Sequence, residues 1–266
     1  MLKIGFIGTG NMGAAVARAV ANSEQPCEII LADSALDKAQ ALAADIPGSR
    51  VVSNEEAAST ADYLFLAVKP QVMPAVLAGI SPILTERKDR FVLVTMAAGL
   101  SCETIRALSG YSGPIIRMMP NTPVSLGHGM IEYCGLDASA EDLDTFSGLL
   151  GSGGITDPVD EKLIDAASAV SGCGPAFVYM FAEALADGGV SCGLPRDKAN
   201  LYAAAMLRGS AEMLLRSGKH PGTLKDEVCS PGGSTIMGVR ALEDAGFRGA
   251  VMDAVIAAYE KTLEMR

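Results

Sequence analysis

The chain has 266 residues and a formal net charge of −10. An acidic protein of this kind offers no basic surface to replace the counterions of a nucleic acid, so the composition argues against nucleic-acid binding. The six cysteines form no CxxC pair and only two histidines are present, so we expect no zinc or other resident metal. Without a basic-then-apolar leader or an apolar run of about 18 residues, we expect a cytoplasmic protein with free thiols and no membrane span.

Residues 3–13 (KIGFIGTGNMG) have the pattern of a strand, a tight turn and the start of a helix. Gly8, Gly10 and Gly13 follow the apolar run in the order GxGxxG. In a dinucleotide-binding turn the first glycine permits the turn, the second lets backbone approach a pyrophosphate, and the third lets the helix pack on the strand. The phosphates then lie on free helix N–H groups. The pattern alone is weak, and a purely structural glycine-rich turn is the alternative.

A second predicted strand gives that turn its context. Residues 28–32 lead directly into Asp33, which lies 20 residues after Gly13. This spacing is typical of a carboxylate that hydrogen-bonds the adenosine ribose. The two features together predict a dinucleotide site at the start of the chain.

A polar side chain follows the third predicted strand. After a helix over residues 35–45 and a short strand at residues 51–52, Ser53 and Glu56 have the spacing of a capping box. Asn54 then falls in the turn at the ligand edge of the sheet, where it is predicted to contact the ligand. Ordinary turn chemistry is the alternative for Asn54.

Two continuous apolar strands come next. Residues 63–68 resemble a strand buried on both faces of a parallel sheet and lead into Lys69. The lysine side chain is predicted to point toward the nucleotide, with a solvated loop lysine as the alternative. Residues 91–95 repeat the pattern and end in small residues that leave room for a flat ring: Ala97, Ala98 and Gly99.

The last strand predicted in this half covers residues 115–118 and leads into a rigid loop, PNTP, in which Asn121 offers hydrogen-bonding groups. Strands that alternate with helices over this length predict a doubly wound parallel sheet. The glycine-rich residues 151–154 are predicted to leave the sheet. We therefore place a dinucleotide-binding domain at residues 1–158 and a second domain at residues 159–266.

The second domain is predicted to be all-helical. Helices are expected over residues 160–170, 174–190, 195–217 and 234–264. Residues 201–215 have few polar positions, and a helix that is apolar over most of its circumference must bury more than one side. Because such helices do not cover themselves, we expect a homodimer held together by this half.

One loop between these helices carries a second chemical signal. Residues 229–235 (CSPGGST) combine a proline and paired glycines just before a helix. A fixed loop with few side chains at a helix N-terminus is an anion site sized for a carboxylate, and the hydroxyls of Ser234 and Thr235 add donors. An ordinary capped turn is the alternative.

These motifs resemble the pyrroline-5-carboxylate reductase family over the whole chain. The similarity lies in IGFIGTGNMG (4–13), AVKP (67–70), MPNTP (119–123), SGCGPAF (171–177) and DEVCSPGGSTIMGVRALEDAGFR (226–248). The resemblance implies an N-terminal Rossmann domain, a helical C-terminal dimerisation domain, and a homodimer or higher oligomer. It also implies an active site between the cofactor crevice of one subunit and helices contributed largely by its partner.

The resemblance further implies NADPH or NADH as the cofactor. Its binding residues would lie in the glycine-rich turn and at the strand ends: Ile7, Gly8, Thr9, Gly10, Asn11, Met12, Gly13, Asp33, Ser34, Asn54, Ala67, Val68, Lys69, Pro70 and Ala97. NADPH-preferring members would have a neutral or basic residue at the position of Asp33, because a carboxylate repels a 2′-phosphate. We therefore expect NADH use or weak discrimination between the two cofactors. Ser34 beside Asp33 is a neutral donor that suits either cofactor.

The implied reaction is hydride transfer from the nicotinamide C4 to the imine carbon of 1-pyrroline-5-carboxylate, which gives L-proline. The substrate carboxylate would rest on the amides of Gly232, Gly233 and Ser234, with Asn121 as a further contact. The Thr235 hydroxyl would hydrogen-bond the ring nitrogen as the catalytic residue. The proton comes either from solvent, with the substrate entering as an iminium, or through Thr235.

Some features depart from the family or favour rivals. Cys173 stands where the family usually has serine, which adds thiol sensitivity, and both histidines, His128 and His220, are expected to be structural. A β-hydroxyacid dehydrogenase would need a catalytic lysine soon after a glycine-rich helix start, and residues 171–184 contain none. A dinucleotide-sensing regulatory subunit would need the first site without the CSPGGST loop.

Overall fold

The computed structural model describes residues 1–265, which form two compact units. Unit 1 comprises Met1–Cys173 and the end of the chain from Ala258, and unit 2 comprises Gly174–Ala257. The division therefore falls after Cys173 instead of at residue 158, where strand β8 ends. The reason is that α7 (Glu161–Ser171) packs on strands β6 and β7 of unit 1.

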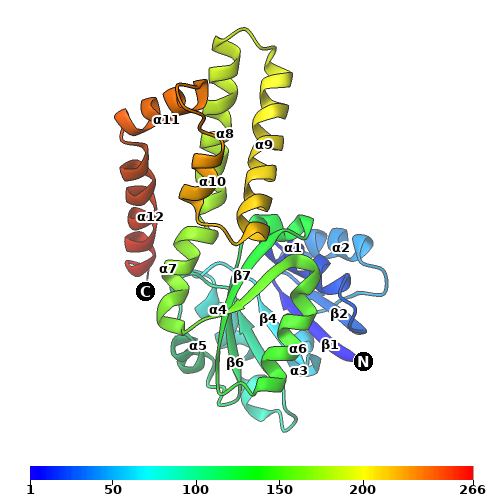
Figure 1. The fold of residues 1–266 in the computed structure, drawn as a ribbon. Helices are drawn as coiled ribbons and strands as arrows, with labels where there is room; N and C mark the ends of the chain where they lie inside the picture. The colour runs from blue at the N-terminus through cyan, green and yellow to red at the C-terminus, as the bar shows by residue number, and fades with distance from the viewer. Residues whose placement is uncertain (266) are drawn as a thin grey trace. The chain divides into compact units, whose positions relative to one another are not determined.

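Unit 1 is built on one sheet of eight strands in the order β3-β2-β1-β4-β5-β6-β7-β8 (Figure 1). The strands from β1 to β6 pair in parallel, and their order is that of a dinucleotide-binding doubly wound sheet, which confirms the predicted fold class. Their bounds are Leu2–Ile7 (β1), Cys27–Ala32 (β2), Arg50–Val51 (β3), Tyr63–Leu66 (β4), Val92–Thr95 (β5) and Ile115–Pro120 (β6).

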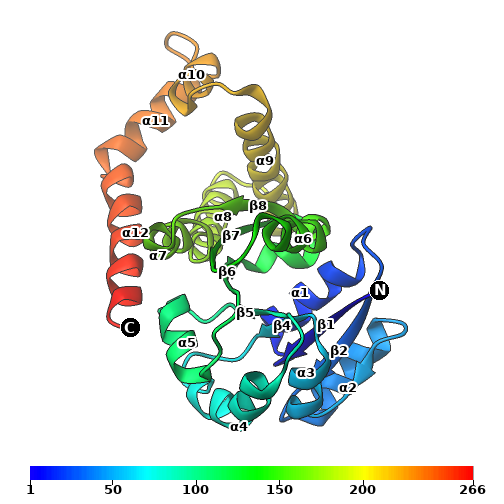
Figure 2. The same ribbon diagram turned by 90° about the horizontal axis from the view of Figure 1, so that it is seen from below.

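Helices cover both faces of this sheet. One apolar core joins the sheet to α1, α2 and α6, and another joins it to α3, α4, α5 and α7. Figure 2 shows α3, α4 and α5 together on one side of the strands. The bounds are Asn11–Ala21 (α1), Leu36–Asp45 (α2), Asn54–Thr60 (α3), Met73–Glu86 (α4), Cys102–Ser109 (α5) and Ala140–Leu150 (α6).

The sequence pattern did not predict the last two strands. β7 (Gly129–Leu136) runs antiparallel to β6, and β8 (Gly154–Pro158) runs parallel to β7. β7 includes the buried but charged Glu132, which interrupts its apolar pattern. Residues 151–154, predicted to leave the sheet, form the short 3-10 helix η2 (Gly151–Gly153) and the start of β8. A second short 3-10 helix, η1 (Thr122–Leu126), follows β6.

A buried ion pair fixes α7 to the sheet. Arg117 of β6 is 2% exposed, and its guanidinium hydrogen-bonds the carboxylate of Asp165, which is also buried. A second guanidinium nitrogen lies 3.6 Å from Oε1 of Glu161, at the start of α7. The same Oε1 accepts the backbone N–H of Cys102 at 2.7 Å. These charged contacts explain why α7 belongs to unit 1 and not to the helical half.

Unit 2 contains α8 (Gly174–Ser191), α9 (Arg196–Ser217), α10 (Pro221–Glu227), α11 (Ser234–Asp244) and the first part of α12 (Phe247–Leu263). The single helix predicted over residues 234–264 is wrong, because the chain breaks at Ala245 and at Gly246, whose φ is +73°. The short α10 was not predicted. Pro221 opens it, and the His220 side chain accepts the N–H of Gly222 as its cap, which is a structural role.

Unit 2 has almost no core of its own. Its buried residues are three alanines, Ala186 of α8 and Ala199 and Ala203 of α9, and α8 and α9 lie side by side (Figure 1). No residue of α10, α11 or α12 is buried among those that the structure describes. Large apolar side chains are exposed instead, among them Tyr179, Met180, Leu201, Leu215, Met237 and Met252. Such a surface marks an interaction site.

One helical stretch, Glu161–Ser191, is long and apolar enough by length and composition to cross a membrane. This differs from our expectation that the chain has no apolar run of that length. The stretch consists of α7 and α8, separated by a turn at residues 172–173. α7 packs on the sheet of unit 1 through Ile164 and Asp165, so its buried face is accounted for within the protein.

Candidate active site

The glycine-rich turn has a different geometry at each of its three glycines. Gly8 has φ +102°, and a Cβ there would lie 2.6 Å from the carbonyl oxygen of Ala67. A Cβ on Gly13 would lie 2.2 Å from the carbonyl oxygen of Gly8, so this position sets the close approach of α1 to β1. A Cβ on Gly10 would meet nothing within 4 Å. The turn is therefore closed at its two ends and open at Gly10, where a ligand can approach the backbone.

The start of α1 suits an anion. The helix begins at Asn11 with Gly10 as its N-cap residue, and no side chain caps it. Its first N–H groups have no partner within the helix. The free amides and the open space beside Gly10 suit a dinucleotide pyrophosphate.

Asp33 is held by the turn itself. Its Oδ2 accepts the backbone N–H of Thr9 at 2.6 Å and the Thr9 hydroxyl at 2.9 Å, while Oδ1 accepts the N–H of Ala35 at 2.8 Å. Burial alone would raise the pKa of Asp33, but the hydrogen bonds from Thr9 and Ala35 outweigh it and hold the pKa below its usual range. Asp33 therefore ties the end of β2 to the turn, and the exposed Ser34 follows it.

The other predicted cofactor residues lie at the carboxyl ends of their strands. Asn54 is the first residue of α3, and the Ser53 hydroxyl accepts the N–H of Glu56 at 3.1 Å. Only this half of the predicted capping box forms, because the Glu56 carboxylate pairs with Arg50 at 2.9 Å. Strand β4 ends at Leu66, before residues 67–70 (AVKP), and the Lys69 side chain is exposed.

The small residues after β5 are not equally accessible. Ala97 is 1% exposed and packs in the core with α4 and α5, so a cofactor could reach its backbone but not its methyl group. The neighbouring Ala98 is half-buried, although we had not included it among the contacts. The strand pattern could not resolve which of the two alanines is buried, and cofactor contact at this loop stays a prediction.

Asn121 is used by the fold. Its Nδ2 donates to the carbonyl of Ser171 at 3.0 Å, and its Oδ1 accepts the N–H of Met130 at 3.0 Å. The side chain is 8% exposed and links the end of β6 to β7 and to α7. Its geometry is that of a positioning residue, and direct contact with a substrate remains a prediction.

The CSPGGST loop in unit 2 leads into α11, as the pattern predicted. Gly232 has φ +68°, and the Gly233 N–H donates to the carbonyl of Ser230 at 3.0 Å. The Gly233 amide is therefore engaged in the turn, and its contact with a substrate carboxylate stays a prediction. α11 begins at Ser234 without a side-chain cap, so the amides without a helical partner start at Ser234 and Thr235. Both residues are exposed.

Comparison with known proteins shows the family of the chain. A curated pyrroline-5-carboxylate reductase from Glycine max is 40% identical over 98% of this chain and 95% of its own length. One from Escherichia coli K12 is 41% identical over 98% of this chain and 97% of its own. The chain belongs to the pyrroline-5-carboxylate reductase family. A crystal structure of Plasmodium falciparum pyrroline carboxylate reductase with NADP bound superposes with a TM-score of 0.87 and 34% identity, over 99% of this chain and 98% of that one.

Two family models match separate parts of the chain. Residues 3–99 match a model described as NADP oxidoreductase, coenzyme F420-dependent, and residues 161–265 match one described as pyrroline-5-carboxylate reductase dimerisation. The first covers the glycine-rich turn and the strand ends, and the second covers the CSPGGST loop and the helices with exposed apolar side chains. The chain is therefore an NAD(P)H-dependent oxidoreductase with a Rossmann-like domain and a dimerisation domain.

Proposed function

We propose that this protein reduces 1-pyrroline-5-carboxylate to L-proline with NADPH or NADH, the final step of proline biosynthesis. The observation that carries the proposal is the similarity to named reductases, which spans nearly the whole chain and so includes both the open turn at Gly10 and the CSPGGST loop. The test is to follow NADPH and NADH oxidation at the nicotinamide absorbance after adding pyrroline-5-carboxylate. Absence of turnover by folded protein that binds the cofactor would refute it.

Each of these two segments has a separate task in this reaction. The dinucleotide, with its pyrophosphate at the glycine-rich turn, would supply the hydride from its reduced nicotinamide. The amides at the start of α11 hold the substrate carboxylate, and the Thr235 hydroxyl hydrogen-bonds the ring nitrogen, which orients the imine carbon. The protonated imine is the better hydride acceptor, and we assign its proton to solvent or to Thr235. Residues 1–158 as the cofactor domain and 159–266 as the substrate and dimerisation domain describe this division of tasks.

We also propose that two or more copies associate through unit 2. The matching dimerisation model covers this unit, and three alanines are too small a core for its helices. A second copy would cover the exposed apolar side chains of α8, including those in the stretch that is apolar enough to cross a membrane. Light scattering at micromolar concentration tests this, and a monomer would contradict it.

We propose the cytoplasm as the location of the protein, since all six cysteines are unpaired.

Replacing Gly10 by alanine is expected to raise the dissociation constant for NADPH at least about tenfold and to leave unfolding nearly unchanged. The added Cβ meets no protein atom within 4 Å, so it occupies only the space where the pyrophosphate is placed. Calorimetric titration with NADPH and thermal unfolding followed by circular dichroism measure the two effects. Gly79→Ala is the matched control, since its Cβ is equally free and it lies in α4. Equal affinities for both variants would remove Gly10 from the cofactor site.

Replacing Asp33 by serine is expected to raise the ratio of kcat/KM with NADPH to kcat/KM with NADH, because the carboxylate that repels a 2′-phosphate is gone. The loss of three hydrogen bonds should also lower the free energy of unfolding by about 1–2 kcal/mol at pH 7. The folded-state pKa of Asp33 is lowered, so this stability is present above the unfolded pKa of about 3.9 and is lost as pH falls through the folded value.

The matched control for this variant is Asp45→Ser, which makes the same charge change at the far end of α2, where Asp45 pairs with Arg18. It should alter neither the cofactor ratio nor the acid limb of unfolding. An unchanged ratio for Asp33→Ser with the expected stability loss would make Asp33 a structural residue only.

A further inference from the structure

Two cysteines that no short motif connects meet beneath α7. Cys102 is the first residue of α5, and Cys134 lies on β7 directly opposite Arg117 of β6. Both side chains are buried. The two sulfur atoms and a carboxylate oxygen of Glu161 all lie within 4.8 Å of one another. None of the three residues belongs to the glycine-rich turn or to the CSPGGST loop.

We propose that Cys102, Cys134 and Glu161 form a binding site for a thiophilic divalent cation of the Zn²⁺ class, with water as the fourth ligand. Two thiolates and a carboxylate are ligands that Zn²⁺ accepts in tetrahedral geometry. Zn–S bonds of about 2.3 Å put tetrahedral ligand atoms about 3.8 Å apart, so these three need to approach one another by no more than about 1 Å. The sequence spacing had led us to expect no metal site.

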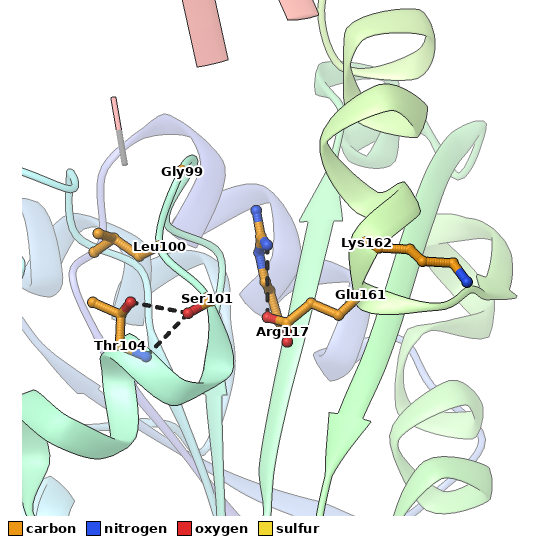
Figure 3. Close-up of a pocket in the computed structure, with 7 residues that line it drawn as sticks. All are labelled: Gly99, Leu100, Ser101, Thr104, Arg117, Glu161 and Lys162. Carbon is orange, nitrogen blue, oxygen red and sulfur yellow. Dashed lines mark hydrogen bonds and ion pairs between the residues drawn. The ribbon is translucent and has the colours of Figure 1, made fainter. Parts of the chain in front are cut away.

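Glu161 is already oriented as a ligand. Its Oε1 accepts the backbone N–H of Cys102 at 2.7 Å and lies 3.6 Å from the Arg117 guanidinium. Figure 3 shows its side chain extending from the start of α7 toward Arg117. Outer contacts of this kind hold metal ligands in place and raise affinity.

The charge of the cluster allows a divalent cation. Replacing two thiol protons by one divalent cation leaves the net charge unchanged, whatever the charges on the neighbouring Arg117, Glu161, Asp165 and Glu132. A bound metal therefore adds no unpaired buried charge.

A cavity of about 360 Å³ lies beside the cluster and shares Glu161 with it. It is lined by residues of the α5 start and the α7 start together with Arg117: Gly99, Leu100, Ser101, Thr104, Arg117, Glu161 and Lys162 (Figure 3). Because Glu161 belongs both to this lining and to the cluster, the cavity is the proposed entry path for the ion and the space for the water ligand. Bound metal would tie the start of α5 to β7.

The test uses reduced, metal-free, full-length protein titrated with Co²⁺. We expect thiolate-to-cobalt charge-transfer absorption that saturates at one equivalent, and displacement by Zn²⁺ with a dissociation constant below about 1 μM. Cys134→Ser and Cys102→Ser should each abolish the two-thiolate signal and weaken Zn²⁺ binding at least about a hundredfold, since each removes a ligand. Zn²⁺ should raise the unfolding temperature of the wild type but not of these variants.

Cys192→Ser is the matched control, because Cys192 is an exposed thiol in unit 2 and should leave the cobalt signal unchanged. Glu161→Gln keeps a side chain of the same size and should weaken binding about tenfold without removing the thiolate signal. Circular dichroism and NADPH binding establish that each variant is folded. Folded, reduced wild type without charge-transfer absorption, or a signal lost equally in Cys192→Ser, would overturn the site.

Discussion

Replacing Thr235 by alanine is expected to lower kcat for pyrroline-5-carboxylate reduction about a hundredfold or more. Thr235 is the second residue of α11, with an exposed hydroxyl beside amides that have no helical partner. If that hydroxyl positions the imine nitrogen, its removal costs an interaction at the reacting atoms. Affinity for NADPH, whose proposed site lies in unit 1, should stay within about twofold. Steady-state kinetics and calorimetric titration of the same preparation measure both.

Two further variants separate a catalytic role from a structural one. Thr235→Ser keeps the hydroxyl and should recover most of the turnover. Thr223→Ala removes an exposed threonine hydroxyl from the neighbouring α10 and should leave kcat unchanged. A loss of thermal stability or of self-association in Thr235→Ala, in proportion to the loss of turnover, would assign the hydroxyl to the start of α11 and not to the reaction.

The largest effect on stability is expected at Arg117. Arg117→Met removes the guanidinium that pairs with the buried carboxylate of Asp165 and lies near Glu161, which should lower the free energy of unfolding by about 3–5 kcal/mol. Urea unfolding followed by far-ultraviolet circular dichroism is the suitable measurement, since the chain contains no tryptophan.

The control is Arg18→Met, which breaks an exposed pair with Asp45 and should cost less than about 1 kcal/mol. Because the penalty comes from the carboxylate left behind, Arg117→Met combined with Asp165→Leu should recover part of it. Equal losses for Arg117→Met and Arg18→Met would show that the buried pair does not hold α7 on the sheet.

The sequence predicted the fold where local physics decides the structure. A short apolar run such as residues 63–66 is typical of a strand buried on both faces. The glycine at position 8 marks the turn after the first strand, and its φ of +102° shows why glycine is needed there. β7 escaped prediction because Glu132 and Cys134 face buried neighbours contributed by distant segments, which no local pattern reports. The same is true of α7, whose place is set by its pairing with Arg117.

The candidate sites divide in the same way. The glycine-rich turn and the CSPGGST loop are contiguous, so their residues could be found by reading along the chain. The sequence could not show which of their atoms remain free to bind a ligand. In the structure, Asp33, Asn121 and the Gly233 amide are all engaged by backbone partners. The approach of Cys102 to Cys134 depends on strand pairing and helix placement, and a search for short cysteine motifs misses it.

The three-alanine core of unit 2 has a consequence for how the protein is made. With two copies associated through unit 2, as we propose, helices that bury so little within one chain would gain most of their stability from the other copy, and folding and assembly would form one concerted step. The unfolding temperature should then rise with protein concentration, and newly synthesised chains at low abundance should be the most exposed to proteolysis. Cells that make little of this protein would therefore lose more of it than its rate of synthesis predicts.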